Sequence, residues 1–404
     1  MVATGCGSSR KRDEERIRGS RLTIYGSVPL EGPDRAAAAD VARGERLALA
    51  QAGGRVGRYD VRLVTLDAAT PKARGWDPAQ ISQNARRAAN DQAAIAYLGE
   101  LDNNSSAISI PLLNEAGILE VSPLDTAMAL TTHSRAVAGS PERYYPNLRE
   151  AGRTFARLVP NDRVQAAALV QYMAGEGVRR VALLVDEDTT ALALAEVVRA
   201  GLPEAGITLA ADEAVDGDAR DHRDLVQRVL AQRPDAVLYA GGAHDLRVRV
   251  DTERLWRELA AADPGLKLFA PDTLADPRFL SAIGAAGEET YVTRPVLALS
   301  AYPLPARRFA RTFAARYGAR PAPEALYGYE AMRAVLAATY SAARKARTGT
   351  LTRAAIVRAF FALRTHDGVL GRYTIDAHGD SSLTRYGAYR VVGGALRYVR
   401  ALAG

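Results

Sequence analysis

Short apolar runs alternate with longer segments of helical periodicity along most of this chain. The runs end at polar or glycine-rich turns, as buried strands do, and the segments between them have the period of helices that cover a sheet. This alternation predicts parallel strands with helices on both faces, an α/β fold. The expected strands are 22–25, 59–66, 93–98, 118–121, 180–185, 207–210, 235–239 and 266–269, and the expected helices are 36–52, 79–90, 163–176, 189–205, 220–232 and 246–262.

The alternation stops and restarts near Pro160, which predicts two similar lobes rather than one continuous sheet. Later segments add elements that must belong to one lobe or the other, so the chain is expected to pass between the lobes several times. The later helices are expected at 305–317, 324–346 and 353–362, and the later strands at 371–375, 386–392 and 396–399.

Two polar turns follow neighbouring strands between Leu98 and Pro123. The first turn follows the strand 93–98 and opens a short helix, and the second follows the strand 118–121. Ligands of open α/β sheets bind at the carboxyl ends of parallel strands. The first turn holds good N-cap residues, and a helix start offers free N–H groups to a small anion such as a carboxylate. These residues are Asn103, Asn104 and Ser105.

This stretch resembles the ligand-contacting part of the type 1 periplasmic binding proteins, in the branch that binds leucine, isoleucine and valine. The matching motifs, in chain order, are Gly99-Glu100-Leu101, Gly117-Ile118-Leu119, Ser122-Pro123 and Thr126. None is diagnostic alone; their order in a resemblance that runs from Leu22 to the C-terminus makes it specific. The resemblance implies two Rossmann-like lobes, each a doubly wound parallel sheet, joined by a three-crossing hinge that lets the lobes close on a ligand.

The domain boundaries expected from this resemblance divide the chain into three parts. A first lobe is expected from 22–158 plus 296–366 and a second from 159–295 plus 367–404, with crossings near 157–159, 294–296 and 365–370. Residues 1–21 are expected to form a disordered tether, because they contain many charges and almost no apolar side chains.

Cys6 is the only cysteine, so no intramolecular disulfide and no cysteine-based metal site is expected. It lies in the segment Ala3-Thr4-Gly5-Cys6-Gly7-Ser8-Ser9, which resembles the end of a bacterial lipoprotein signal, where the cysteine is lipidated after cleavage. The apolar region that precedes such a cysteine is missing from this sequence. A lipid anchor on a polar tether is the favoured interpretation, and a chance match is the alternative.

The resemblance also assigns roles to individual residues. The turn 103–105 would bind the α-carboxylate of the ligand, although two asparagines replace the small hydroxyl or thiol residues of the family. Thr126 would contact ligand amine and carboxylate, and Leu124, beside Asp125, would offer backbone groups. Asp272 corresponds to an acidic residue, one carbon longer in the family, that pairs with the ligand ammonium. For each of these turns, plain helix capping is the alternative interpretation.

Three further positions argue against leucine as the ligand. Ala37, Thr190 and Gly242 stand where the family usually has aromatic side chains along the ligand. Their small size leaves more space and less apolar contact area, so the ligand is expected to be larger or more polar than leucine. Trp76 is a candidate replacement wall; packing under its own loop is the alternative.

Several other functions are disfavoured by the composition. The net charge of +7 comes mainly from arginines scattered over helical faces, whereas nucleic-acid binding needs them clustered with exposed aromatics. No stretch reaches the about 18 apolar residues of a membrane span. The five histidines show no zinc spacing, and no nucleophile elbow, phosphate loop or dinucleotide fingerprint occurs. No metal, no cofactor and no enzymatic activity are therefore expected.

The function expected from the resemblance is that of an extracytoplasmic, lipid-anchored solute-binding protein of an ABC importer. It would bind a small polar solute, an amino acid or a derivative, and deliver it to a membrane permease. The first lobe would hold the anionic end, and Asp272 and Thr190 of the second lobe would close over the cationic end. Alternatives are a ligand-sensing receptor domain with the same fold, an enzyme, and a lobe pair that has lost ligand binding.

Overall fold

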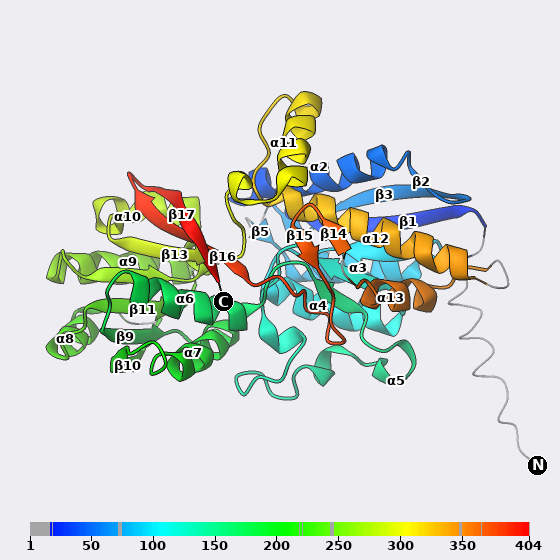
Figure 1. Cartoon of the computed structure of the whole chain (residues 1–404). Coiled ribbons are helices and arrows are strands. Elements are labelled where there is room, and N and C mark those ends of the chain that lie inside the picture. Colours follow the sequence, from blue (N-terminus) through cyan, green and yellow to red (C-terminus); the bar gives the residue numbers. More distant parts are fainter. Residues whose placement is uncertain are drawn as a thin grey trace, which may run out of the picture.

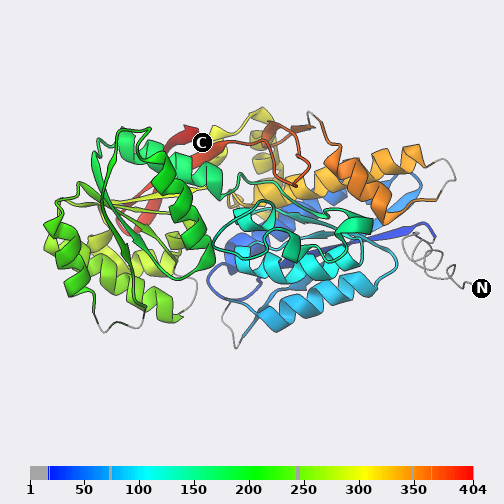
Figure 2. The ribbon, with the colours of Figure 1, turned by 90° about the horizontal axis from the view of Figure 1, so that it is seen from below.

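Two α/β lobes lie side by side and are connected by several passages of the chain (Figure 1). The computed structural model describes residues 17, 19–71, 75–217, 219, 221–242, 246–346, 350–364 and 366–403, with the backbone only for 103 and 246–248. Figure 2 shows the ribbon turned by 90° from the view of Figure 1. In it the second lobe is mainly green, and the first lobe is mainly blue and cyan with the orange helices packed on it.

The first lobe is built on a six-stranded sheet. Its strands are parallel except β2, which pairs antiparallel with β3. In sheet order they are β2 (Arg55–Val56), β3 (Tyr59–Asp67), β1 (Arg21–Val28), β6 (Ala94–Leu98), β7 (Leu119–Ser122) and β8 (Phe155–Arg157). The helices are α2 (Arg35–Gln51), α3 (Pro78–Asn90), α4 (Asn103–Glu115), α5 (Leu148–Ala151), α11 (Leu304–Tyr317), α12 (Ala325–Lys345) and α13 (Arg353–Phe361).

Helices cover both faces of this sheet because alternate strand residues point to opposite sides. Leu22 and Ile24 of β1 belong to the core under α2 and α12, whereas Tyr25 belongs to the core under α3 and α4. The helices α2 and α12 approach closely at two glycines: a methyl group on Gly44 or Gly328 would overlap the backbone of the other helix.

The second lobe is built on a seven-stranded sheet. Its first five strands are parallel, as expected, and the last two pair antiparallel at the edge, so the sheet is mostly parallel. In sheet order they are β10 (Thr208–Ala214), β9 (Arg180–Val185), β11 (Ala236–Ala240), β12 (Lys267–Ala270), β13 (Thr290–Arg294), β16 (Arg385–Val392) and β17 (Ala395–Ala403). The helices are α6 (Asp162–Gly175), α7 (Thr189–Gly201), α8 (Arg223–Ala231), α9 (Leu246–Ala262) and α10 (Pro277–Ile283).

The antiparallel pair follows from a tight hairpin. Gly393 and Gly394 connect β16 to β17, and both have positive φ, 59° and 72°. Such a two-residue turn with left-handed backbone favours glycine and reverses the chain at once, so the two strands must run in opposite directions.

The chain crosses between the lobes three times: after β8, after β13 and before β16. The third crossing comes later than expected. The short hairpin of β14 (His366–Gly368) and β15 (Gly371–Tyr373) packs on the first lobe, because Tyr373 is part of its core and donates a hydrogen bond to the buried Glu330 of α12 (2.9 Å). The expected start of the second lobe's last segment at 367 is therefore too early. No helix in the described part of the chain could span a membrane.

Candidate functional site

A cleft lies between the two lobes, with about 510 Å³ of empty space that is partly open to solvent. A smaller cavity of about 340 Å³ continues it and shares Asn104, Asp162 and Thr190. The first lobe lines the cleft with Asp102, Asn104 and Thr126. The second lobe lines it with Asp162, Gln165, Asp188, Thr190, Ala191, Leu194, Gly241, Gly242, Pro271, Asp272 and Thr273.

Five residues singled out from the sequence meet in this cleft. All five lie just beyond the carboxyl end of a parallel strand, which is where ligands of such sheets bind. They are Asn104 after β6, Thr126 after β7, Thr190 after β9, Gly242 after β11 and Asp272 after β12.

Other candidates do not line either cavity. Ser105 is buried, and its hydroxyl donates to the backbone carbonyl of Asp102 (2.9 Å). Leu124 packs against the apolar side chains around Val28. Trp76 is half-buried in its own short hairpin, formed by β4 (Ala69–Thr70) and β5 (Gly75–Trp76). The side chain of Asn103 lies outside the described part of the structure.

The helix start in the first turn is capped differently from the expectation. The N-cap of α4 is Asp102, whose Oδ1 accepts hydrogen bonds from the backbone N–H groups of Asn104 (2.9 Å) and Ser105 (3.4 Å). Asp188 caps α7 in the same way, by accepting from Thr190 (2.8 Å) and Ala191 (3.3 Å). Both helix starts at the cleft are therefore already occupied by a carboxylate.

The other two carboxyl groups of the cleft are less well paired. Asp162 is 2% exposed, and its Oδ2 has no hydrogen-bond partner. Burial raises the pKa of Asp162 well above its ordinary value, and the negative charge of Asp272 adds to the shift. Asp272 accepts a hydrogen bond from Nε2 of Gln165 (2.7 Å), and burial raises its pKa as well.

The sequence analysis missed Asp162 because it began the helix at Arg163. The sequence did contain a signal, because asparagine is a favoured N-cap residue and Asn161 directly precedes Asp162. In the structure, Asn161 accepts a hydrogen bond from the backbone N–H of Arg163 (3.1 Å). A helix that starts after Asn161 has Asp162 as its first residue, and Asp162 lines the cleft.

A buried arginine supports the segment that carries Thr126. Arg157 at the end of β8 is completely buried and forms ion pairs with Asp380 (2.8 Å) and Asp125 (3.7 Å). It also donates to the backbone carbonyls of Asp125 (3.1 Å) and Ala127 (2.8 Å). Burial lowers the pKa of Arg157, but both carboxylates raise it, and the net shift is upward. Asp125 thus belongs to this internal network rather than to the cleft surface.

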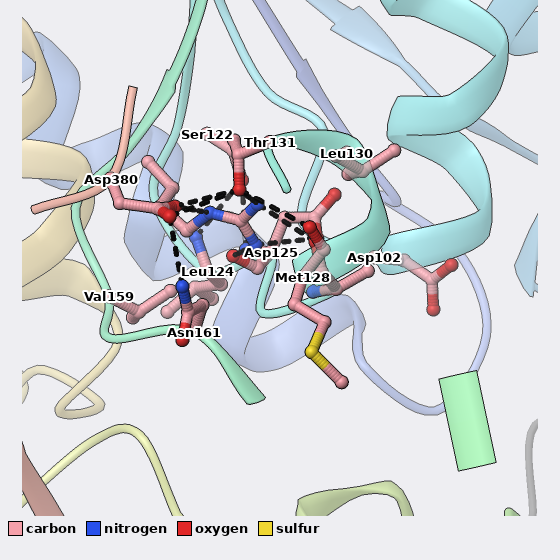
Figure 3. Close-up of polar contacts among 12 residues, drawn as sticks. Asp102, Ser122, Leu124, Asp125, Met128, Leu130, Thr131, Val159, Asn161 and Asp380 are labelled. Atoms are coloured by element: carbon pink, nitrogen blue, oxygen red, sulfur yellow. Dashed lines mark hydrogen bonds and ion pairs between the residues drawn. The ribbon is translucent and has the colours of Figure 1, made fainter. Parts of the chain in front are cut away.

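Asp380 links this network to the third crossing. Its carboxylate accepts hydrogen bonds from Nδ2 of Asn161 (2.9 Å) and from Oγ1 of Thr131 (3.1 Å). Figure 3 shows Asp125, Thr131, Asn161 and Asp380 gathered around the guanidinium group. The first and third crossings are therefore tied together by this network. Among the residues described, no cluster of His, Cys, Asp and Glu side chains could hold a metal ion.

Comparison with known proteins identifies the family. A family model described as periplasmic binding protein matches residues 23–395. The chain belongs to this family. An amino acid binding protein of Pseudomonas aeruginosa is 26% identical over 194 residues, which are 48% of this chain and 46% of that protein. The match thus spans about half the length of this curated relative.

Solved structures of leucine, substrate and solute binding proteins share the fold over nearly the whole chain. A leucine binding protein from Thermotoga maritima is similar with a TM-score of 0.74 and 20% identity, covering 95% of this chain and 99% of the other. A substrate binding protein from Streptococcus pneumoniae in complex with isoleucine has a TM-score of 0.71, 16% identity and the same coverage. A solute binding protein from R. palustris in complex with benzoate has a TM-score of 0.67 and 16% identity, covering 95% and 96%. These similarities establish the two-lobed fold.

Proposed function

We propose that this chain is an extracytoplasmic solute-binding protein of an ABC importer, which binds a small polar solute and delivers it to a membrane permease. Membership of the periplasmic binding protein family supports the location and the general role. The observation that carries the proposal is the cleft, because polar side chains from both lobes line it at the ends of parallel strands.

The solute proposed is an amino acid or a derivative of one, since proteins of similar structure bind leucine and isoleucine. Asn104 and Thr126 would contact it from the first lobe, and Thr190, Gly242 and Asp272 from the second. A ligand that touches both lobes favours the closed arrangement, because only that arrangement makes all the contacts at once. The closed form would then dock on the permease.

A first experiment tests whether the cleft binds a solute at all. Native mass spectrometry of the purified protein is expected to show a co-purified small molecule, and a thermal-shift panel of amino acids, amides and polyamines is expected to contain a stabilising compound. The same compound should stabilise an Asn104→Ala variant less. Absence of any bound molecule and of any shift across the panel would refute solute binding.

A second experiment separates transport from sensing. Reconstitution with a candidate permease in vesicles should give solute uptake that depends on this protein. A solute that binds but is not taken up with any candidate permease would favour a receptor role instead. Lipidation of Cys6, which lies outside the described residues, is tested by cell fractionation of a bacterial expression host. A Cys6→Ser variant should move from the membrane fraction to the soluble fraction.

A further inference from the structure

The cleft is acidic. Four aspartates line it, and among its described lining residues none is lysine, arginine or histidine. These aspartates are Asp102, Asp162, Asp188 and Asp272. A cavity lined by one sign of charge concentrates ligands of the opposite sign and repels those of the same sign.

The starts of α4 and α7, two of the helices at the cleft, do not offer an unoccupied site for an anion. Their N–H groups are already bound by the side chains of Asp102 and Asp188. A ligand carboxylate placed there would have to compete with these caps and would meet two negative charges. A ligand carboxylate is therefore not expected to bind at the starts of α4 and α7.

The other two aspartates lack a cation of their own. Asp162 is buried with Oδ2 unpartnered, and Asp272 has a neutral partner, Gln165. The two arginines that interact with them electrostatically, Arg157 and Arg294, have carboxylate partners of their own. Arg157 pairs with Asp125 and Asp380, and Arg294 pairs with Glu324 (2.5 Å). Buried charges in proteins are normally paired, so an unpartnered carboxyl oxygen on a residue that lines the cleft leaves an acceptor for a positively charged donor of the ligand.

We infer that the solute is an organic cation, an amine with more positive than negative charges, whose ammonium group binds between Asp162 and Asp272. The inference rests on the cleft being the solute site proposed above and names the chemical class of that solute. An ammonium group donates up to three hydrogen bonds, which suits two carboxylates on different elements, α6 and the turn after β12. It would also favour the ionised form of two carboxyl groups whose pKa is raised in the free protein.

Matched pairs of small molecules test the charge directly by calorimetry with the purified full chain. L-Lysine and L-norleucine have the same carbon chain and differ in the terminal ammonium group. 1,5-Diaminopentane and 5-aminopentanoate differ at one end only. We expect the more cationic member of each pair to bind at least about tenfold tighter, and benzoate not to bind.

Substitutions then locate the binding group. Asp162→Asn and Asp272→Asn keep the side-chain volume and remove the charge, and each is expected to reduce the lysine-to-norleucine preference by about tenfold. Asp367→Asn on the exposed hairpin β14–β15 removes the same charge far from the cleft and should leave the preference unchanged. Thermal unfolding without solute shows whether each variant folds.

The outcomes separate this inference from the proposal on which it rests. Binding of norleucine or benzoate as tight as that of every cation would overturn the cationic class while leaving solute binding intact. A lysine preference that survives both asparagine substitutions would overturn the assignment to Asp162 and Asp272. Failure of every cation to bind overturns the inference, and it counts against solute binding itself only if no other compound of the panel binds.

Discussion

At the scale of single residues, Arg157 has the largest role in holding the site in shape. Its guanidinium group is the cation shared by the carboxylates of Asp125 and Asp380, and it also orders the carbonyls of the segment that carries Thr126. Removing one member of a buried ion pair leaves the remaining charge buried without compensation. The resulting loss of folding free energy is larger than the net stability that the pair contributes.

An Arg157→Met substitution should therefore destabilise the protein strongly. We expect the free energy of unfolding to fall by about 3–5 kcal/mol, because Asp125 stays buried without a cation. Urea unfolding measures this change. Arg163→Met, on the exposed surface of the neighbouring helix, is the control and should cost less than about 0.5 kcal/mol. A loss below about 1 kcal/mol for Arg157→Met would show that the network is not important for stability.

Glu45 of α2 predicts a pH dependence. Its side chain is completely buried, neither carboxyl oxygen has a hydrogen-bond partner, and burial raises its pKa to about 8. In the unfolded chain this carboxyl group titrates near its ordinary value of 4.5. The stability that its protonated form allows is thus complete below about pH 4.5 and is lost as the pH rises toward 8.

A Glu45→Met substitution should remove that part of the pH dependence. We expect the variant to be more stable than the parent at pH 8 by about 2 kcal/mol, with the difference shrinking toward pH 5. Urea unfolding at several pH values between 5 and 8 gives the free energy of unfolding as a function of pH for the parent and for the variant. Parallel slopes for parent and variant would mean that Glu45 does not titrate in this range.

At the scale of elements, the close contact of α2 with α12 depends on two glycines. A Gly44→Ala methyl group would overlap the backbone carbonyl of Ala325, which cannot move without shifting the helix. Although alanine favours helices, the overlap should dominate, and we expect a loss of about 3 kcal/mol in urea unfolding. Gly201 of α7 has room for a methyl group, so Gly201→Ala is the control, expected to be neutral or slightly stabilising. Equal effects of the two substitutions would contradict the close packing.

The periodic elements could be predicted from the sequence because their signal is local, and the exceptions depend on distant partners. The strands β8 and β13 lead directly into crossings between the lobes, and they were not expected as strands. The hairpin β14–β15 lies on the first lobe because Glu330, far away in the chain, accepts from Tyr373. Capping by Asp102 rather than by Asn103 depends on where the backbone turns from extended to helical, which the composition of the turn does not determine.

At the scale of the whole molecule, the candidate site could be located from the sequence but not described electrostatically. The strand end predicted a ligand site at the turn that carries Asn104, the family resemblance added Thr126 and Asp272, and all three line one cleft. Asp162 was missed because its helix was expected to begin one residue later, and its burial beside the cleft depends on contacts that are distant in the sequence. The same holds for Asp380, which reaches Arg157 across more than half of the chain.

Asp380 predicts how the lobes are held relative to one another. Its carboxylate connects the third crossing to Arg157 and Asn161 of the first, so movement of one crossing is resisted by the other. Asp380→Asn removes the charge and weakens this link while keeping a side chain of the same size. We expect hydrogen exchange in 158–161 and 374–384 to become about tenfold faster, equal to about 1.4 kcal/mol, with the cores of both lobes unchanged. Asp367→Asn is the control at the exposed hairpin. Unchanged protection in both crossings would mean that lobe position is set by packing alone, and closure on a solute would then not require this link to rearrange.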